Sequence, residues 1–189
     1  MKDYEILTFP SEQNFKEWLH VHHANTPGVW LKIAKKASGI KSIDRKQALN
    51  VALCYGWIDG QAKTVDEQYY LQKFTPRRAR SMWSKVNIKL VAKLIDEGKM
   101  QPAGQAAIDE AKADGRWDAA YDPPSTATVP PEFIEALNAH PKAAAFYETL
   151  NKTNKFAIAW RIQTARKEET KQRRIEKIIA MLESGETFH

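Results

Sequence analysis

The stretch that decides the fold of the N-terminal half opens with Tyr55-Gly56-Trp57-Ile58-Asp59-Gly60-Gln61 and closes with Phe74-Thr75-Pro76-Arg77-Arg78-Ala79-Arg80-Ser81-Met82-Trp83-Ser84. Residues 57–65 and 69–74 predict two strands that are joined around Asp66-Glu67-Gln68, which together make a β-hairpin. The tryptophan and arginine side chains of this stretch are costly to bury without polar partners. We therefore expect them to converge on one polar site with aromatic walls.

Strands and helices surround this hairpin on both sides. The expected strands cover residues 4–9 and 29–34, and the expected helices cover 11–22, 45–55, 84–98 and 102–114. Helix 45–55 is apolar on most of its sides, which predicts a central position in the core. Cys54 lies on this apolar helix, where a thiolate is disfavoured, so we expect an inert core residue rather than a nucleophile.

A proline-rich segment separates this region from an all-helical one. Residues 123–131 have linker composition, because each proline disfavours helix at the residue before it. Every later segment predicts helix, at residues 132–138, 141–150, 154–165 and 169–183. In the last of these, Ile175, Ile178, Ile179 and Leu182 form the apolar core stripe, and Lys171, Arg173, Arg174 and Lys177 lie largely outside it. The predicted fold class is α+β, with an N-terminal unit of short antiparallel strands with helices (1–122), a linker (123–131) and a C-terminal helical bundle (132–189).

Composition narrows the class of protein. The 189 residues hold 29 Lys and Arg against 23 Asp and Glu, a formal net charge of +6. A single cysteine excludes an intramolecular disulfide. No apolar run approaches the ~20 residues that span a bilayer, so no membrane span is expected. The first residues also lack the apolar core of a signal peptide, which predicts a cytoplasmic location.

Several C-terminal segments resemble a known family of bacterial proteins. The segments are Val129-Pro130-Pro131-Glu132-Phe133, Ala136-Leu137, Ala143-Ala144-Ala145-Phe146-Tyr147, Ala165-Arg166-Lys167-Glu168-Glu169-Thr170-Lys171-Gln172-Arg173-Arg174-Ile175 and Met181-Leu182-Glu183-Ser184-Gly185. They are similar to the YdeI/OmpD-associated (OmdA, "bacteriocin-protection") family, closely so over residues 129–186. Upstream, residues 55–60, 74–78, 83–84, 87 and 115–117 look like the longer members.

The resemblance implies a role in envelope stress or porin association. A periplasmic porin partner would require an export signal, which this sequence lacks, so the porin role is not carried over. The resemblance implies no catalytic residue that could be transferred to this chain. The chemistry must therefore be sought in the residues themselves.

The opening and closing parts of the hairpin stretch together predict an anion site. Trp57 and Asp59 share one face of their strand, and Arg78 and Arg80 would share one face of an extended segment. Arginine holds a carboxylate or phosphate bidentately, and a helix start offers free N–H groups to an anion. The candidate ligand-binding residues are Trp57, Asp59, Arg77, Arg78, Arg80, Trp83 and Ser84. The alternative stays open that Asp59 pairs with an arginine internally and that both tryptophans only pack the interior.

Other patterns give weaker signals. His20 and His23 are three residues apart on one helix, but no third ligand at a matching spacing completes a metal site, so no metal is expected. Gly98 and Gly104 do not form a phosphate loop, and no cofactor is predicted.

Three functions remain open from the sequence. The leading one is a cytoplasmic binding protein for a small anionic ligand or an acidic protein partner. The second is a nucleic-acid-associated module, because seven basic and no acidic residues lie between Lys73 and Lys93 and further basic residues, Arg166 among them, line the last helices. The third is an enzyme of unknown reaction, with Asp59 as general base and Arg78 or Arg80 stabilising negative charge.

Overall fold

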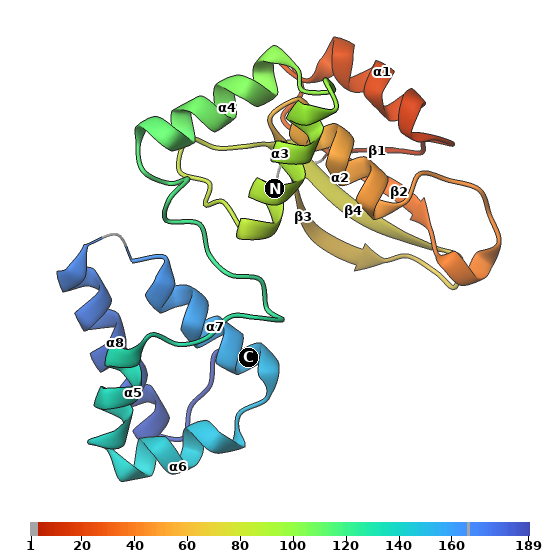
Figure 1. The fold of residues 1–189 in the computed structure, drawn as a ribbon. Coiled ribbons are helices and arrows are strands. Elements are labelled where there is room, and N and C mark those ends of the chain that lie inside the picture. Colours follow the sequence, from red (N-terminus) through yellow and green to blue (C-terminus); the bar gives the residue numbers. More distant parts are fainter. Residues whose placement is uncertain (1–3, 166) are drawn as a thin grey trace. The chain divides into compact units, whose positions relative to one another are not determined.

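A computed structural model describes residues 4–165 and 167–189 of the chain (Figure 1). Arg166 of the basic C-terminal region lies outside the described residues. The chain divides into two compact units. The N-terminal unit comprises Met1–Ser81 and Lys89–Asp114, and the C-terminal unit comprises Met82–Ile88 and Gly115–His189. The predicted linker, residues 123–131, lies within the C-terminal unit, and the predicted division into domains at 1–122 and 132–189 stays a prediction.

A four-stranded mixed sheet forms the centre of the N-terminal unit. Its strands are β1 (Glu5–Leu7), β2 (Val29–Ala34), β3 (Trp57–Thr64) and β4 (Tyr69–Pro76), in the order β1-β2-β4-β3. The predicted hairpin is confirmed as the antiparallel pair β3–β4, and β2 pairs antiparallel with β4. The expectation of antiparallel strands is wrong for β1, which runs parallel to β2. Helix α1 (Glu12–His22) connects these two strands and carries the chain back to the starting end of the sheet, as a parallel pair requires.

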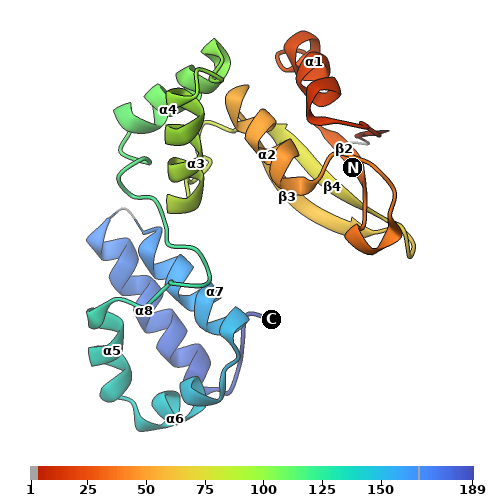
Figure 2. The same cartoon turned by 45° about the vertical axis from the view of Figure 1, so that its right-hand side comes forward.

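Two helices cover one face of this sheet (Figures 1 and 2). Ser11 caps α1 by accepting a hydrogen bond from the backbone of Asn14 (3.3 Å). Asp44 begins α2 (Arg45–Cys54) with a reciprocal capping box. The aromatic ring of Phe15 on α1 packs against Phe74 of β4, with centroids 5.8 Å apart. Five of the ten residues of α2 are buried, which confirms its central position.

The C-terminal end of α2 approaches another helix very closely. Helix α4 (Pro102–Ala113) follows α3 (Lys85–Asp96), and the amide of Gln101 donates to the carbonyl of Cys54 (3.1 Å). A Cβ atom on Gly104 would lie only 2.2 Å from that same carbonyl oxygen. Glycine is therefore required at this position, and it allows the backbones of α2 and α4 to touch.

Four helices build the core of the C-terminal unit: α5 (Pro131–Asn138), α6 (Pro141–Thr149), α7 (Lys152–Gln163) and α8 (Glu168–Glu183). The predicted apolar stripe of α8 is confirmed, and the buried residues of this core are Phe133, Leu137, Ala143, Tyr147, Ile158, Ile162, Ile175, Ile178, Ile179 and Leu182. Lys171 of α8 donates to Glu132 of α5 (2.5 Å). This bond raises the pKa of Lys171 and lowers the pKa of Glu132.

The predicted α+β fold class is confirmed by this architecture. No helix in the described part of the chain is long and apolar enough to cross a membrane.

Candidate functional site

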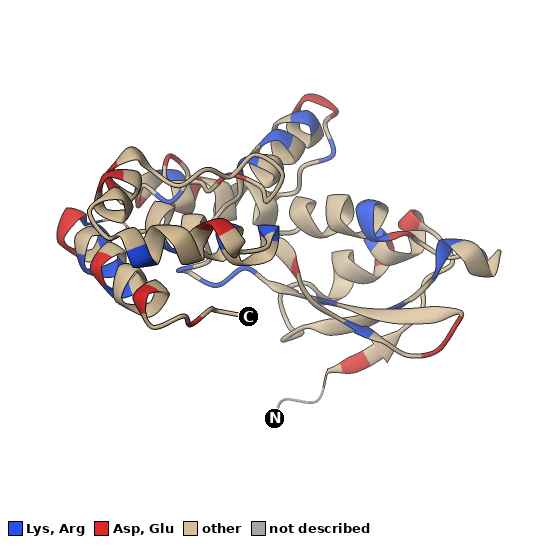
Figure 3. Ribbon diagram, turned by 90° about the horizontal axis from the view of Figure 1, so that it is seen from below, with Lys and Arg blue, Asp and Glu red and all other residues tan. Residues whose placement is uncertain are grey.

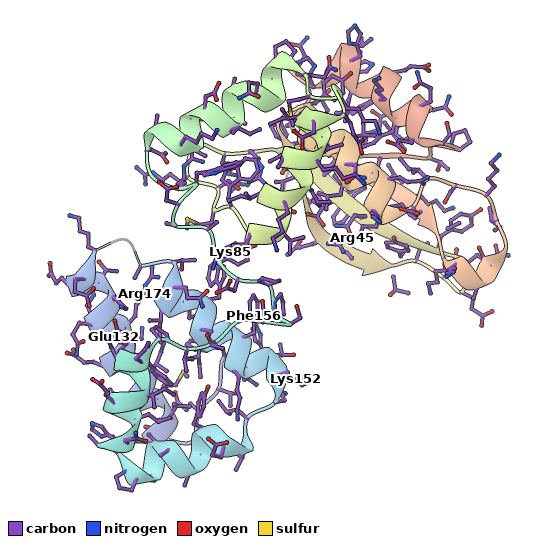
Figure 4. All side chains as sticks on the ribbon, in the orientation of Figure 1. Arg45, Lys85, Glu132, Lys152, Phe156 and Arg174 are labelled. Atoms are coloured by element: carbon purple, nitrogen blue, oxygen red, sulfur yellow. The ribbon has the colours of Figure 1, made fainter. Side chains whose placement is uncertain are left out.

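Trp57 and Asp59 share one face of β3, as predicted, and both are held by partners inside the N-terminal unit. The ring of Trp57 is 1% exposed, packs edge-on against Trp18, and donates its Nε1 hydrogen to the carbonyl of His23 (3.1 Å). Asp59 forms its ion pair with Arg45 at the start of α2, where Figure 4 labels that residue. The arginine that neutralises Asp59 is therefore supplied by a helix, and the buried ring of Trp57 offers no open face to a ligand.

Arg77, Arg78 and Arg80 follow the end of β4. The amide of Arg77 donates to the carbonyl of Gly56 (2.9 Å), which extends the pairing of the hairpin. The amide of Ser81 then donates to the carbonyl of Arg78 (2.8 Å), so the chain turns here. The expectation that Arg78 and Arg80 lie on one face of an extended segment is wrong. The chain turns over residues 78–81, so these side chains do not alternate as they would in a strand. Both side chains are exposed.

Trp83 and Ser84 belong to the C-terminal unit. Trp83 is 1% exposed, and its ring lies 5.1 Å from that of Trp117. Ser84 accepts a hydrogen bond from the amide of Asn87 (3.2 Å) at the start of α3 and thereby caps this helix. The seven candidate residues thus fall into two units, and their assembly into one anion site stays a prediction.

The histidines and Cys54 have structural surroundings. His22 stacks on Trp18, and Nδ1 of His23 lies 2.9 Å from the carbonyl of Leu19. No group of three or more His, Cys, Asp or Glu among the residues of known placement could hold a metal ion. Burial raises the pKa of the Cys54 thiol to about 11, which confirms an unreactive core cysteine.

A pocket between α7, α8 and the last residues combines apolar walls with a cationic edge. This α7–α8 pocket has a volume of about 340 Å³. Its walls come from Trp160, Ile178, Met181 and Phe188, and its polar lining comes from Arg161, Thr164, Arg174 and Lys177. All of these residues lie within the C-terminal unit.

The end of the chain positions one wall of this pocket. The amide of His189 donates to Oδ1 of the buried Asn154 (3.1 Å), and Nδ2 of Asn154 donates back to the carbonyl of His189 (3.3 Å). This reciprocal pair holds the preceding Phe188 against α7. The guanidinium of Arg161 then lies over the ring of Phe188, 3.7 Å from its centroid.

Backbone and hydroxyl contacts fix the two arginines of the pocket. Nη1 of Arg161 donates to the carbonyl of Ala157 (3.0 Å). Nη1 of Arg174, labelled on α8 in Figure 4, donates to the carbonyl of Arg161 and to Oγ1 of Thr164 (3.2 Å). Lys177 follows Arg174 by three residues and therefore lies on the same side of α8. None of these three cations pairs with a carboxylate among the residues that the structure describes, so the pocket edge carries uncompensated positive charge.

A second cavity, of about 290 Å³, lies beside Cys54 in the N-terminal unit. Glu12, Lys16 and Lys99 contribute charges of both signs to its lining, and Lys99 already pairs with Glu97 (2.7 Å). Oδ1 of Asn50, which also lines this cavity, is buried and has no hydrogen-bond partner among the described residues. This mixed lining suits an anion less well than the α7–α8 pocket does. Asp59 lines neither cavity.

Sequence reasoning found only part of the α7–α8 pocket. It identified Arg174 and Lys177 as basic residues outside the core stripe of the last helix, and it missed Trp160, Arg161 and Phe188. The available signal was Arg161, a cation in an otherwise apolar helix. Phe188 carried no signal, because only the fold of the last residues brings it to α7.

The family comparisons agree with the division of the chain. Residues 7–107, more than half of the sequence, match the family described as Domain of unknown function (DUF8412), and the chain belongs to this family. Residues 126–185 match the family described as Bacteriocin-protection, YdeI or OmpD-Associated, which confirms the resemblance for the C-terminal part. No curated protein and no solved structure is significantly similar to the chain. All residues of the α7–α8 pocket except Phe188 fall within the second match.

Proposed function

We propose that this protein binds a small organic anion with an apolar body, and that the α7–α8 pocket is the binding site. The observation that carries the proposal is a set of three cations without carboxylate partners at the edge of an apolar cavity. The cavity volume of about 340 Å³ lies within the range of ~300–1,000 Å³ typical of small-molecule sites. A concave pocket favours a small ligand over the surface of an acidic protein.

Each lining group has a distinct role in this proposal. The free nitrogens of Arg161 and Arg174 face a carboxylate or phosphate head, for which the planar guanidinium is suited. Lys177 adds a flexible point charge at the rim. Trp160 and Phe188 pack against the apolar body of the ligand, which gains hydrophobic energy as water leaves the pocket.

A thermal-shift experiment tests this function with octanoate and benzoate as probes, and with octanamide and benzamide as neutral controls. A ligand at about 100 times its dissociation constant stabilises the fold by about 2.7 kcal/mol. We expect the carboxylates to raise the melting temperature and the amides to leave it unchanged. Lys177→Gln should reduce the shift in melting temperature. Lys152 is an exposed lysine on α7 outside the pocket, so the control variant Lys152→Gln should leave the shift unchanged.

A further pair of variants separates this site from the hairpin arginines. If Arg78→Gln and Arg80→Gln abolish the shift and Lys177→Gln does not, the ligand binds near the hairpin and the α7–α8 pocket is not the site. A wild-type protein that responds equally to acids and amides would remove the anion proposal altogether.

We further propose a cytoplasmic location and a role in stress. A single cysteine that is free and buried fits a reducing compartment. The description of the matched C-terminal family, bacteriocin protection, supports a stress-related role. Fractionation of cells that carry a tagged chain tests the location, and recovery in the periplasm would contradict it.

A further inference from the structure

The sheet of the N-terminal unit has one face that no helix in the described part of this unit covers. Helices α1 and α2 lie on the opposite side, where Phe15 of α1 packs against Phe74 of β4 (Figures 1 and 2). Figure 3 marks Lys and Arg in blue, and strands of the sheet carry blue segments. The pairing of β2 with β4 assigns the side chains to the two faces, because directly opposed residues point the same way. Val29, Leu31 and Phe74 point toward the helices and are buried. Their neighbours Trp30 and Lys73, which oppose each other, point to the other side, here called the open sheet face.

Aromatic rings and lysines alternate across the open sheet face. The register places Ile6 opposite Trp30, Lys32 opposite Leu71, Ala34 opposite Tyr69, and Lys63 opposite Leu71.

The ammonium of Lys32 lies 4.2 Å from the ring centroid of Tyr69, and that of Lys63 lies 4.7 Å from Trp30. Lys73 lies 4.2 Å from the ring of Tyr4 and 5.8 Å from Trp30. Three lysines therefore rest on three aromatic rings.

The lysines explain why the central ring is shielded. Trp30 is only 8% exposed, although no helix of this unit lies over it. Lys63 and Lys73 contribute to this cover, because their ammonium groups lie 4.7 Å and 5.8 Å from the ring centroid of Trp30. Such a cover is displaceable, because each lysine can turn outward toward an anion and uncover the ring.

The charge of this face has a single sign. Its strand positions carry Lys32, Lys63 and Lys73, and no aspartate or glutamate occupies a described strand position on the same side. In the strand register Asp59 lies directly opposite Phe74, so its side chain is on the helix-covered side. An uncovered basic surface with aromatic rings is complementary to a polyanion that carries flat, stackable groups.

We propose that the open sheet face binds single-stranded nucleic acid. Bases stack on Tyr4, Trp30 and Tyr69, while Lys32, Lys63 and Lys73 move from the rings to the phosphates. Stacking on aromatic side chains combined with backbone neutralisation is the general physics of single-strand recognition. A duplex keeps its bases stacked internally and cannot use the rings. This site lies in the N-terminal unit and is independent of the small-anion pocket proposed above.

Fluorescence anisotropy with labelled dT12 and rU12 tests the proposal at several salt concentrations, with a duplex of equal length for comparison. We expect both single strands to bind more tightly than the duplex. For single strands, the logarithm of the binding constant falls with the logarithm of the salt concentration, with a slope of about −0.7 per neutralised phosphate. Three lysines therefore predict a slope of about −2. Failure of the wild-type protein to bind either single strand at low salt, or equal affinity for the duplex, would overturn the proposal.

Charge variants assign the binding to this face. The triple change of Lys32, Lys63 and Lys73 to Gln should lower affinity at least about tenfold and flatten the salt dependence, since three phosphate contacts are lost. The same lysines changed to Arg should retain binding, because the charge and the stacking are preserved. The matched control changes Lys46, Lys142 and Lys152 to Gln, which are exposed lysines on helices. An equal loss in this control would show diffuse attraction and would refute the assignment.

A ring variant tests the stacking. Tyr69→Leu keeps an apolar side chain and removes the aromatic face, and we expect about fivefold or greater loss of affinity with an unchanged salt slope. Unchanged affinity in this variant would contradict base stacking at Tyr69. Poly-L-glutamate serves as an acidic polypeptide without flat groups. If it displaces dT12 equally well at equal charge, the face recognises an acidic protein instead, and the nucleic-acid proposal fails.

Discussion

Cys54 shows at the scale of one residue how position sets chemistry. It ends α2, its carbonyl accepts the amide of Gln101, and its side chain is buried. Burial raises the thiol pKa from 9.0 to about 11, and this outweighs the attraction of the thiolate to Lys16 and Lys99. The nucleophilic thiolate is therefore absent near neutral pH.

This pKa predicts a pH-dependent stability. Between pH 9 and 11 the folded protein keeps the thiol proton that the unfolded chain loses, so the contribution is complete below pH 9 and is lost as the pH rises toward 11. The loss amounts to at most about 3 kcal/mol in the free energy of unfolding. Urea unfolding at pH 8 and pH 10.5 should show a smaller decrease for Cys54→Ala than for the wild type. Identical decreases would contradict the raised pKa.

Asp59 illustrates what residue-scale reasoning from the sequence leaves open. Its need for a cationic partner was predictable, because a partly buried carboxylate requires one. Three arginines stood nearby in the sequence, yet the partner is Arg45, fourteen positions upstream. The choice depends on the packing of α2 against β3, which local spacing does not encode.

At the scale of elements, periodicity and end signals predicted nearly every helix and strand. Ser11, Asp44 and Ser84 each accept the capping bond expected of a helix start. A strand was expected at residues 4–9, but the pairing of β1 with β2 and its parallel direction were not predictable in this way. A strand of three residues carries little pattern, and its direction follows from the path of α1.

Gly104 gives a prediction at the same scale. Within an ordinary helix, Gly→Ala stabilises by about 1 kcal/mol. In α4 the new methyl group would meet the carbonyl of Cys54 at 2.2 Å and the sulfur of Met100 at 2.5 Å, so we expect Gly104→Ala to destabilise by about 1–3 kcal/mol. Chemical denaturation measures the change. Gly60→Ala is the control, because its Cβ would have only ordinary contacts at 3.8 Å or more. A more stable Gly104→Ala protein would disprove the close approach of α2 and α4.

At the scale of the whole molecule, each unit has its own core. All ten buried residues of the C-terminal core lie between Phe133 and Leu182, on the four helices α5 to α8. A helical bundle with its own continuous core has what a domain needs to fold alone. The separate C-terminal domain that the proline-rich composition of residues 123–131 predicts can therefore be tested with a fragment.

A fragment of residues 123–189 tests that expectation. We expect it to be helical by circular dichroism and to unfold in one cooperative thermal transition, because no residue of the core is removed. A fragment that melts without cooperativity would show that the residues before 123 are needed. The companion fragment 133–189 lacks Val129, which packs against the core, and should be less stable.

The sequence by itself determined the local structure: the hairpin, the helix boundaries, the α+β class and the apolar stripe of α8. These follow from periodicity, caps and turn residues, which act between neighbours in the chain. Only the tertiary structure decided which side chains meet. It paired Asp59 with Arg45, brought Phe188 to Arg161, and placed three lysines over the rings of one sheet face. The physical reason is that such contacts join residues far apart in the chain, and strand order and helix packing alone bring them together.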